Sequence, residues 1–386
     1  MGCVLSRSNG EPKILPQPSG PYSVGCADLM TCSSDADNGL FIRLFYPTDK
    51  IDLQEVEKKD LTQWMVEPVE NYTDGSALMD CPCCTCCWKR IYRRGPFRVL
   101  IYSAGKGGHR AGNSVFGTHL ASHGFVVAHI EHRSGDCGWT YKLTTDGKKE
   151  ELWGYQVAPE IPFKDYHKYD IYLQNEERCE PFRKLIDYRV EECLRTLQLL
   201  QDLSEGTVRF QDMAVGQEFN WTQFQGRITT ENAALAGHSL GGSTSVAGMS
   251  CPEFKYFIHH DPQMFVVRHH LFEEMNRFKP TKALFFIQDL HEWTSEIAKQ
   301  EFMCRTAEQL QCGERTVLRI LKARHVQFCD APFLDSCWCR LIKENAIKME
   351  VMQEILDETA LALLTDDPKR MDGVLERYKE HIVIEY

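Results

Sequence analysis

The sequence predicts an α/β fold with a mostly parallel central sheet and helices on both faces. Two apolar runs, at 97–105 and 124–132, flank a segment that fits a crossover helix, and strand–helix–strand order is typical of parallel strands. GHSLGG, at 237–242, directly follows another apolar run and precedes small residues that suit a closely packed helix. The same alternation continues downstream, so a doubly wound sheet is expected.

The first 95 residues contribute one clear strand. Residues 7–37 contain the turn-forming segment PQPSGP and are expected to be loop. GLFIRLFYP, at 39–47, alternates as a strand does. Residues 49–90 run from an acidic, helix-compatible stretch into CPCCTCCWKR, and neither part indicates a core element.

The later elements alternate between helix and strand. Residues 135–177 are polar and aromatic and are expected to form an elaborated loop. A long helix is predicted over 181–203, with Leu185, Cys193, Leu197 and Leu200 along one side. A final amphipathic helix is predicted over 340–364, ended by DDP. The remaining predicted strands are NAALAG (232–237), KYFIHH (255–260), KALFFIQ (282–288) and RTVLRIL (315–321).

Composition narrows the class of protein. The chain has 386 residues, 43% of them apolar and 26% charged, which suits one large α/β domain. We expect that domain over 19–386, with insertions at 49–95 and 135–177, behind a flexible tail at 1–18. The net charge of −11 argues against a nucleic-acid partner, because phosphate backbones are bound mainly by clustered Lys and Arg. The sequence does not predict the oligomeric state.

The N-terminus carries a lipidation pattern. MGCVLS matches the motif in which Gly2 is myristoylated, and Cys3 beside it is a common palmitoylation position. Two acyl chains anchor a protein stably where one does not. With no secretory signal and 17 cysteines expected as free thiols, we expect a cytoplasmic protein, peripheral on the cytoplasmic face of membranes. The alternative is an unmodified tail that matches the motif by chance.

Ser239 is the candidate nucleophile. It is the centre of a G-x-S-x-G motif placed between a predicted strand and a predicted helix. In that context a sharp turn exposes the serine hydroxyl, and the flanking glycines avoid collision with neighbouring backbone. The alternative is a glycine-rich turn after a buried strand.

The base and the acid should lie downstream, because the order on such folds is nucleophile, acid, histidine. His325, directly after the last predicted strand, has the required position; His291 precedes that strand, and His259 and His260 lie too close to a strand. Asp261 and Asp289 both follow strands; on such folds the acid usually follows the later strand, which favours Asp289, but chain order alone leaves the choice of acid open.

The oxyanion site requires two backbone N–H donors. One comes from the residue after the nucleophile, Leu240. The other is expected from the glycine-rich loop YSAGKGGHR, at 102–110, where the main chain of Lys106 is the natural donor.

The chain resembles the platelet-activating-factor acetylhydrolases, α/β hydrolases that remove short or oxidised acyl groups from the sn-2 position of phospholipids without calcium. The resemblance covers SGPYSVGCADLM, LFIRLFYPT, LASHGFVVAHIEHR, GHSLGG, HHDPQMF and RHVQFCDAPF. It implies an intracellular, myristoylated type with the triad Ser239, Asp261 and His325, a phospholipid substrate and no metal or organic cofactor.

Two segments depart from the family pattern. The family has histidine–glycine where this chain has Ala104 and Gly105, and an apolar residue in place of Lys106. Backbone donation survives both changes, and we expect the Lys106 side chain to be solvated. Residues 81–95 combine five cysteines with Trp, Lys and Arg. They suit an anionic membrane surface better than zinc, since the overlapping spacing lacks two separate pairs; an exposed loop without function is the alternative.

The leading expectation is therefore a calcium-independent serine esterase. A general carboxylesterase would use the same residues on another ester. A membrane-tethered protein that binds lipid or a partner without turnover is the alternative from another class, because fold alone does not confer function. Acyl-chain preference and head group depend on the pocket and are not predicted.

Overall fold

A computed structural model describes the chain in ten ranges: residues 15–32, 39–49, 90–134, 136–144, 146–153, 176–209, 213–267, 281–289, 313–334 and 345–385. The lipidation motif at Gly2 and Cys3, His291, and all but the end of the 81–95 segment lie outside these residues.

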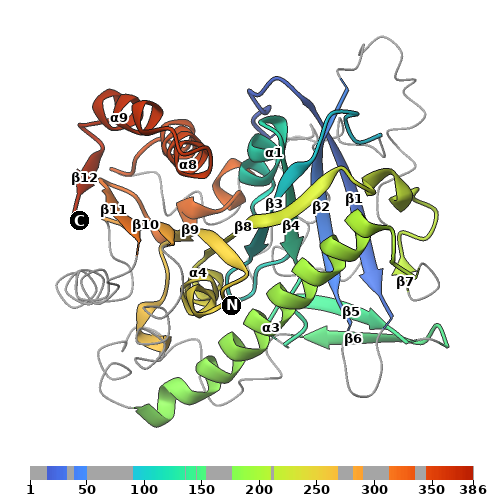
Figure 1. Cartoon of the computed structure of the whole chain (residues 1–386). Helices are drawn as coiled ribbons and strands as arrows, with labels where there is room; N and C mark the ends of the chain where they lie inside the picture. The colour runs from blue at the N-terminus through green and yellow to red at the C-terminus, as the bar shows by residue number, and fades with distance from the viewer. Residues whose placement is uncertain are drawn as a thin grey trace, which may run out of the picture.

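One large sheet organises the described residues (Figure 1), with the strand order β12-β11-β10-β9-β8-β3-β4-β2-β1-β7. The six strands from β11 to β4 in that order run parallel, whereas β2, β1, β7 and β12 join them antiparallel. A separate antiparallel pair, β5 and β6, stands beside the sheet. The strands are β1 (Ser23–Thr31), β2 (Phe41–Thr48), β3 (Phe97–Ser103), β4 (Phe125–Ile130), β5 (Trp139–Leu143), β6 (Lys149–Trp153), β7 (Met213–Val215), β8 (Ile228–His238), β9 (Phe254–His260), β10 (Lys282–Gln288), β11 (Glu314–Ile320) and β12 (Ile382–Ile384).

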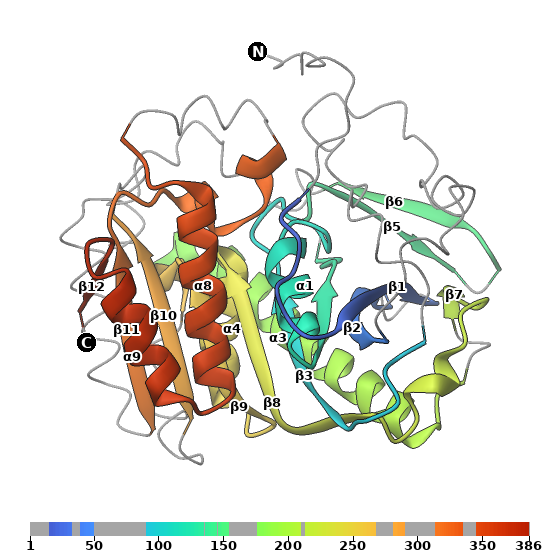
Figure 2. The ribbon, with the colours of Figure 1, turned by 90° about the horizontal axis from the view of Figure 1, so that it is seen from above.

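Helices cover both faces of the sheet, as Figures 1 and 2 show. Helices α3 and α4 pack on one face, whereas α1 and α8 pack on the other, with α9 against α8. The sequence-based prediction of a mostly parallel sheet between two helical layers is confirmed. The helices are α1 (Ser114–Ser122), α3 (Glu176–Glu205), α4 (Leu240–Ala247), α8 (Met349–Leu364) and α9 (Pro368–Arg377).

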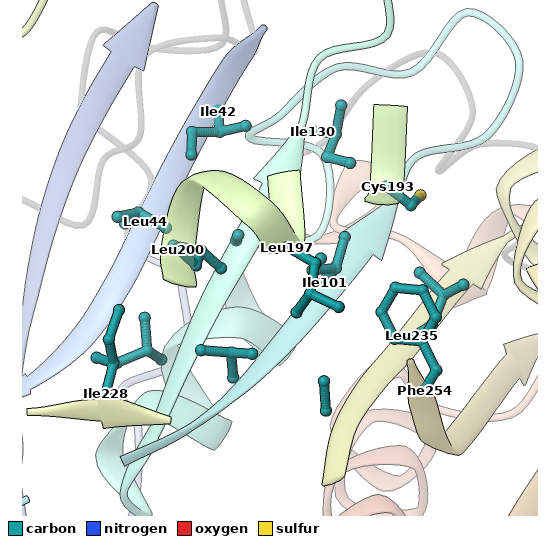
Figure 3. Packing of buried hydrophobic residues seen from close by; sticks show 14 of the residues in the cluster. Ile42, Leu44, Ile101, Ile130, Cys193, Leu197, Leu200, Ile228, Leu235 and Phe254 are labelled. Atoms are coloured by element: carbon teal, nitrogen blue, oxygen red, sulfur yellow. The ribbon is translucent and has the colours of Figure 1, made fainter. Parts of the chain in front are cut away.

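The two apolar cores follow from the period-2 geometry of the strands. Along β3, Val99 and Ile101 face the α3 side, whereas Leu100 and Tyr102 face the α1 and α8 side. Central parallel strands are buried on both faces, which explains their continuous apolar runs. Figure 3 shows the α3 side, where Leu197 and Leu200 lie among side chains of the sheet.

Two segments predicted to be loop contain strands. Residues 7–37 include β1, which pairs with β2 from Ser23 to Met30, and an Arg43–Asp28 ion pair at 2.7 Å joins the two strands. Gly25 and Asp28 weaken the local strand signal, so β1 depends on pairing. The described part of 135–177 forms the β5–β6 hairpin rather than irregular loop.

Helix ends also differ from the prediction. Helix α3 begins at Glu176, five residues earlier, and contains Pro181. Helix α8 begins at Met349 rather than at 340. DDP ends α8 as predicted and also starts α9, because Asp367 accepts a hydrogen bond from the Arg370 N–H at 3.0 Å and Pro368 is the first helical residue.

Replacement of a core leucine of α3 tests the packing of this helix. Leu200 is fully buried against the sheet, so Leu200→Ala should lower the free energy of unfolding by about 2–5 kcal/mol. Denaturant unfolding followed by circular dichroism measures it. Glu191→Ala, on the exposed side of the same helix, is the control and should change stability little; equal effects of the two substitutions would contradict the packing.

Candidate active site

The turn that carries Ser239 is strained and tightly packed. Ser239 stands between β8 and α4 with φ 58° and ψ −119°, a conformation that costs about 1–3 kcal/mol in a residue other than glycine. A Cβ on Gly241 would lie 2.0 Å from the carbonyl oxygen of Ser103, and one on Gly237 would lie 2.2 Å from that of Gly241. The glycines of the motif are therefore sterically required, and the strain at Ser239 is held by its surroundings.

Backbone hydrogen bonds fix this turn to the neighbouring strand. The N–H of Ser239 donates to the carbonyl of His260 at 3.0 Å, and the N–H of Gln263 donates to the carbonyl of Ser239 at 3.3 Å. Leu240 is the first residue of α4, and the first N–H groups of a helix are available to acceptors outside it. The predicted first oxyanion donor is thus next to the serine.

The structure brings Asp261 and His325 together. Nδ1 of His325 and Oδ2 of Asp261 form a short hydrogen bond. Asp261 directly follows β9, has φ 43° and is completely buried, whereas the His325 side chain, after β11, is 20% exposed. A buried carboxylate that binds Nδ1 leaves Nε2 as the nitrogen for proton transfer.

Gln288 holds both members of this pair, and the sequence analysis missed it. Its backbone N–H donates to Oδ1 of Asp261 at 3.2 Å, and its side-chain oxygen accepts from the N–H of His325 at 2.9 Å. Gln288 is the last residue of β10 and is buried. A polar residue at the carboxyl end of a parallel strand is the signal that could have indicated it.

The rival acid, Asp289, is engaged elsewhere. Its carboxylate accepts from Arg319 at 3.1 Å and from the N–H of Lys322 at 2.9 Å, and Arg319 also binds Glu385 at 2.6 Å. Of the two candidate acids, Asp261 is therefore the one hydrogen-bonded to His325, whereas Asp289 binds Arg319 and Lys322.

The other histidines near the strand ends have different partners. His259 contacts Ser245 at 2.6 Å, and His260 contacts the Tyr102 hydroxyl at 3.2 Å. His238, which precedes the serine, places its Nε2 3.0 Å from the His325 carbonyl, with 4.6 Å between the two ring centroids. Burial holds the pKa of His238 well below its usual range, so the neutral ring donates from Nε2. Sequence reasoning did not identify this contact between the turn and the His325 loop.

The predicted oxyanion loop lies against the serine. A Cβ on Gly105 would be 3.2 Å from Cβ of Ser239. Arg189 of α3 donates to the carbonyl of Ala104 at 2.5 Å and forms a buried ion pair with Asp136. The carbonyl of Asp136 accepts from the N–H of Gly107 at 2.7 Å. The backbone on either side of Lys106 is therefore fixed from α3 and from the segment after β4.

The Lys106 side chain differs from the expectation of a solvated lysine. It is half-buried, with Nζ 5.1 Å from the ring centroid of Phe182. Burial lowers the pKa of the ammonium group. The Phe182 ring and the charges of Asp136 and Arg189 act on this side chain, which is therefore part of the packing at the loop.

The described residues contain no group of three or more His, Cys, Asp or Glu side chains placed to hold a metal ion. The seven cysteines among them are free thiols, which agrees with the expectation from the sequence. The run from Cys81 to Cys87 lies outside these residues, and its role stays a prediction.

Comparison with known proteins agrees with this architecture. The family model described as platelet-activating factor acetylhydrolase, isoform II, matches residues 8–373. Platelet-activating factor acetylhydrolase from Bos taurus is 30% identical over 351 residues, 86% of this chain and 72% of that protein. The protein of the same name from Canis lupus familiaris is 27% identical over 336 residues, 83% of this chain and 69% of that protein.

Among solved structures, a ferulic acid esterase from Streptomyces cinnamoneus is similar in fold. Its TM-score is 0.53 at 16% sequence identity, with 95% of this chain and 93% of that chain covered. At this identity the likeness concerns the fold, and it agrees with the α/β-hydrolase arrangement of sheet and helices.

The contrast between the two aspartates gives a direct test of the site. Asp261→Asn should lower kcat for an activated ester by up to about 10⁴-fold, because the neutral amide favours the wrong histidine tautomer. Asp289→Asn removes only the contacts to Arg319 and Lys322 and should leave kcat within a few-fold of wild type. Near-wild-type turnover by Asp261→Asn would exclude Asp261 as the acid.

Proposed function

The chain belongs to the platelet-activating factor acetylhydrolase isoform II family, and from that premise we propose that it is a calcium-independent serine esterase. Its proposed substrates are phospholipids with a short or oxidised sn-2 acyl chain, such as platelet-activating factor, and its products are acetate and a lysophospholipid. The observation that carries the proposal is the Asp261–His325 hydrogen bond, at the strand ends where the strained Ser239 turn also lies.

In the proposed reaction Ser239 attacks the sn-2 carbonyl carbon while Nε2 of His325 takes the hydroxyl proton. Asp261 keeps the Nδ1–H in place and stabilises the imidazolium that forms. Collapse of the tetrahedral intermediate breaks the ester bond, and His325 returns the proton to the leaving lysophospholipid oxygen. Water, deprotonated by His325, then attacks the acetyl-serine, and acetate leaves as the proton returns to Ser239.

In the proposed reaction, backbone N–H groups rather than a metal ion stabilise the oxyanion. The amides of Leu240 and Lys106 donate to the oxygen that becomes negative in both tetrahedral intermediates. This arrangement requires a rigid loop, because the benefit of an oxyanion site comes from donors oriented in advance. The contacts of Arg189 and Asp136 to the loop supply that rigidity.

A membrane location is part of the proposal. In the part of the chain that the structure describes, none of the helices combines the length and apolar character needed to cross a bilayer. We propose attachment through acyl chains on Gly2 and Cys3, with the basic, cysteine-rich 81–95 segment contributing at an anionic surface. The enzyme would then lie on the cytoplasmic face of the membrane that supplies its substrate.

The substrate proposal is tested with two phospholipids in the presence of a calcium chelator. One carries an sn-2 acetyl group and the other two long acyl chains. Wild-type protein should release acetate from the first and act at least about tenfold more slowly on the second, because a short acyl pocket discriminates by a few kcal/mol. Ser239→Ala should be inactive on both. Absence of wild-type hydrolysis of both lipids and of an activated ester would favour a binding protein. Equal rates of hydrolysis of the two lipids would favour a general carboxylesterase.

The anchor is tested by Gly2→Ala expressed in eukaryotic cells. This variant should lack the myristoyl mass and shift from the membrane pellet to the supernatant, with its esterase activity unchanged. Cys3→Ser should keep the myristoyl mass and show partial release, since one chain binds only marginally. A wild-type protein whose Gly2 carries no acyl group would contradict the proposal.

A further inference from the structure

A second serine–histidine–acid chain lies beneath the oxyanion loop. Oγ of Ser103, the last residue of β3, is 2.7 Å from Nε2 of His132, and Nδ1 of His132 is 2.7 Å from Oε2 of Glu192. His132 follows β4 and Glu192 belongs to α3, so three elements meet here. Ser103 and Glu192 are completely buried and His132 is 2% exposed. The connectivity resembles a catalytic triad, but the burial keeps a substrate carbonyl away from Ser103.

The position of the protons also separates this chain from a catalytic triad. Burial raises the pKa of Glu192 to about 8 and lowers that of His132 well below its usual range. At neutral pH the carboxyl group of Glu192 is therefore protonated. Its Oε2 donates to Nδ1 of His132, and its Oε1 accepts from the N–H of Arg133 at 3.3 Å. The neutral imidazole then carries its proton on Nε2 and donates to Ser103. An Nε2–H cannot take a proton from serine, so Ser103 is an acceptor and not a nucleophile.

Ser103 occupies the junction between the nucleophile turn and the oxyanion loop. Its carbonyl oxygen is the atom that a Cβ on Gly241 would approach to 2.0 Å, and one on Gly237 to 2.8 Å. The part of the oxyanion loop that leaves β3 begins at the next residue, Ala104. A shift of Ser103 therefore changes the distance between Ser239 and the amide of Lys106.

Helix α3 reaches this junction at two points. Arg189 binds the carbonyl of Ala104, and Glu192, three residues later on the same side of the helix, reaches Ser103 through His132. The hydroxyl of Ser103 and the carbonyl of Ala104 are thus both linked to the same helix. The charges of Arg189, Arg195 and Asp136 act on the carboxyl group of Glu192, in addition to the hydrogen bond from the backbone N–H of Arg133.

We propose that the hydrogen-bonded chain Ser103–His132–Glu192 has a positioning role: it holds the start of the oxyanion loop at a fixed distance from the Ser239 turn. It acts through the backbone donors and does not touch the substrate. Misplacement of a catalytic group by about 1 Å can cost about 10²-fold in rate, so loss of the chain should weaken stabilisation of the oxyanion selectively. The inference rests on the proposed serine esterase function.

The test compares Ser103→Ala, which removes the acceptor with little change of volume, with Ser245→Ala. The control removes another completely buried Ser–His contact, at 2.6 Å to His259 on the α4 side. For each variant we would measure kcat/KM on p-nitrophenyl acetate, Ki for a trifluoromethyl ketone that adds reversibly to the active serine, and the midpoint of urea unfolding. The ketone adduct carries the oxyanion, so its Ki reports on the oxyanion site.

Ser103→Ala should lower kcat/KM about tenfold or more and raise Ki by a similar factor, whereas Ser245→Ala should change only the unfolding midpoint. Glu192→Gln should keep wild-type kcat/KM, because the amide can donate to His132 and accept from Arg133 as the protonated acid does. Glu192→Leu should lose activity as Ser103→Ala does.

Unchanged kcat/KM and Ki in both Ser103→Ala and Glu192→Leu would overturn the positioning role while leaving the esterase proposal intact. A loss of activity in Ser103→Ala with an unchanged Ki would overturn it as well, because the defect would then lie outside the oxyanion site. Absence of wild-type turnover on p-nitrophenyl acetate would instead contradict the proposed function itself.

Discussion

The arrangement of the site depends on the close approach of β3 to the turn after β8. The carbonyl of Ser103 lies where any side chain on Gly241 would collide with it, and this contact fixes the first turn of α4 against the end of the sheet. Ser239 is held at a positive φ by that packing and by the His260 carbonyl. The same contact sets the oxyanion loop beside the serine. Strain in one residue is thus offset by the parallel strands around it.

Helix α3 links the stability of the core to the geometry of this contact. Its apolar side, with Leu197 and Leu200, packs on the sheet (Figure 3). Near the middle of the helix, Arg189 binds the oxyanion loop and Glu192 reaches the end of β3 through His132. Buried polar groups are costly unless they are hydrogen-bonded, and here Arg189 binds the carbonyl of Ala104, whereas Glu192 binds the side chain of His132. Core packing of the helix therefore determines where these groups lie.

The sequence predicted the parts whose physics is local. Strands buried on both faces appear as apolar runs, and the glycines around Ser239 show that backbone approaches closely there. It missed the short edge strands β7 and β12, which depend on pairing with a distant partner, and it missed β1, which lies between β2 and β7 and whose Gly25 and Asp28 weaken the strand pattern. The β5–β6 hairpin pairs locally, and it was missed because Lys142, Lys149 and Glu150 weaken the strand signal of its two short strands.

Within the site, the sequence named His325 but left two aspartates open, because both follow parallel strands. Only the three-dimensional structure shows that Asp289 is taken by Arg319 and that Asp261 faces His325. Gln288 and His238 act through contacts between loops far apart in the chain, and no local pattern marks them.

The most direct measurement is labelling of the full-length protein with a fluorophosphonate, followed by peptide mapping by mass spectrometry. The described residues include the proposed Ser239–His325–Asp261 triad and the Ser103–His132–Glu192 chain, and the account assigns nucleophilic chemistry to Ser239. It predicts a single adduct, on Ser239, with Ser103 unmodified. An adduct on Ser103, or an intact Ser239 at complete exposure to the probe, would contradict the assignment.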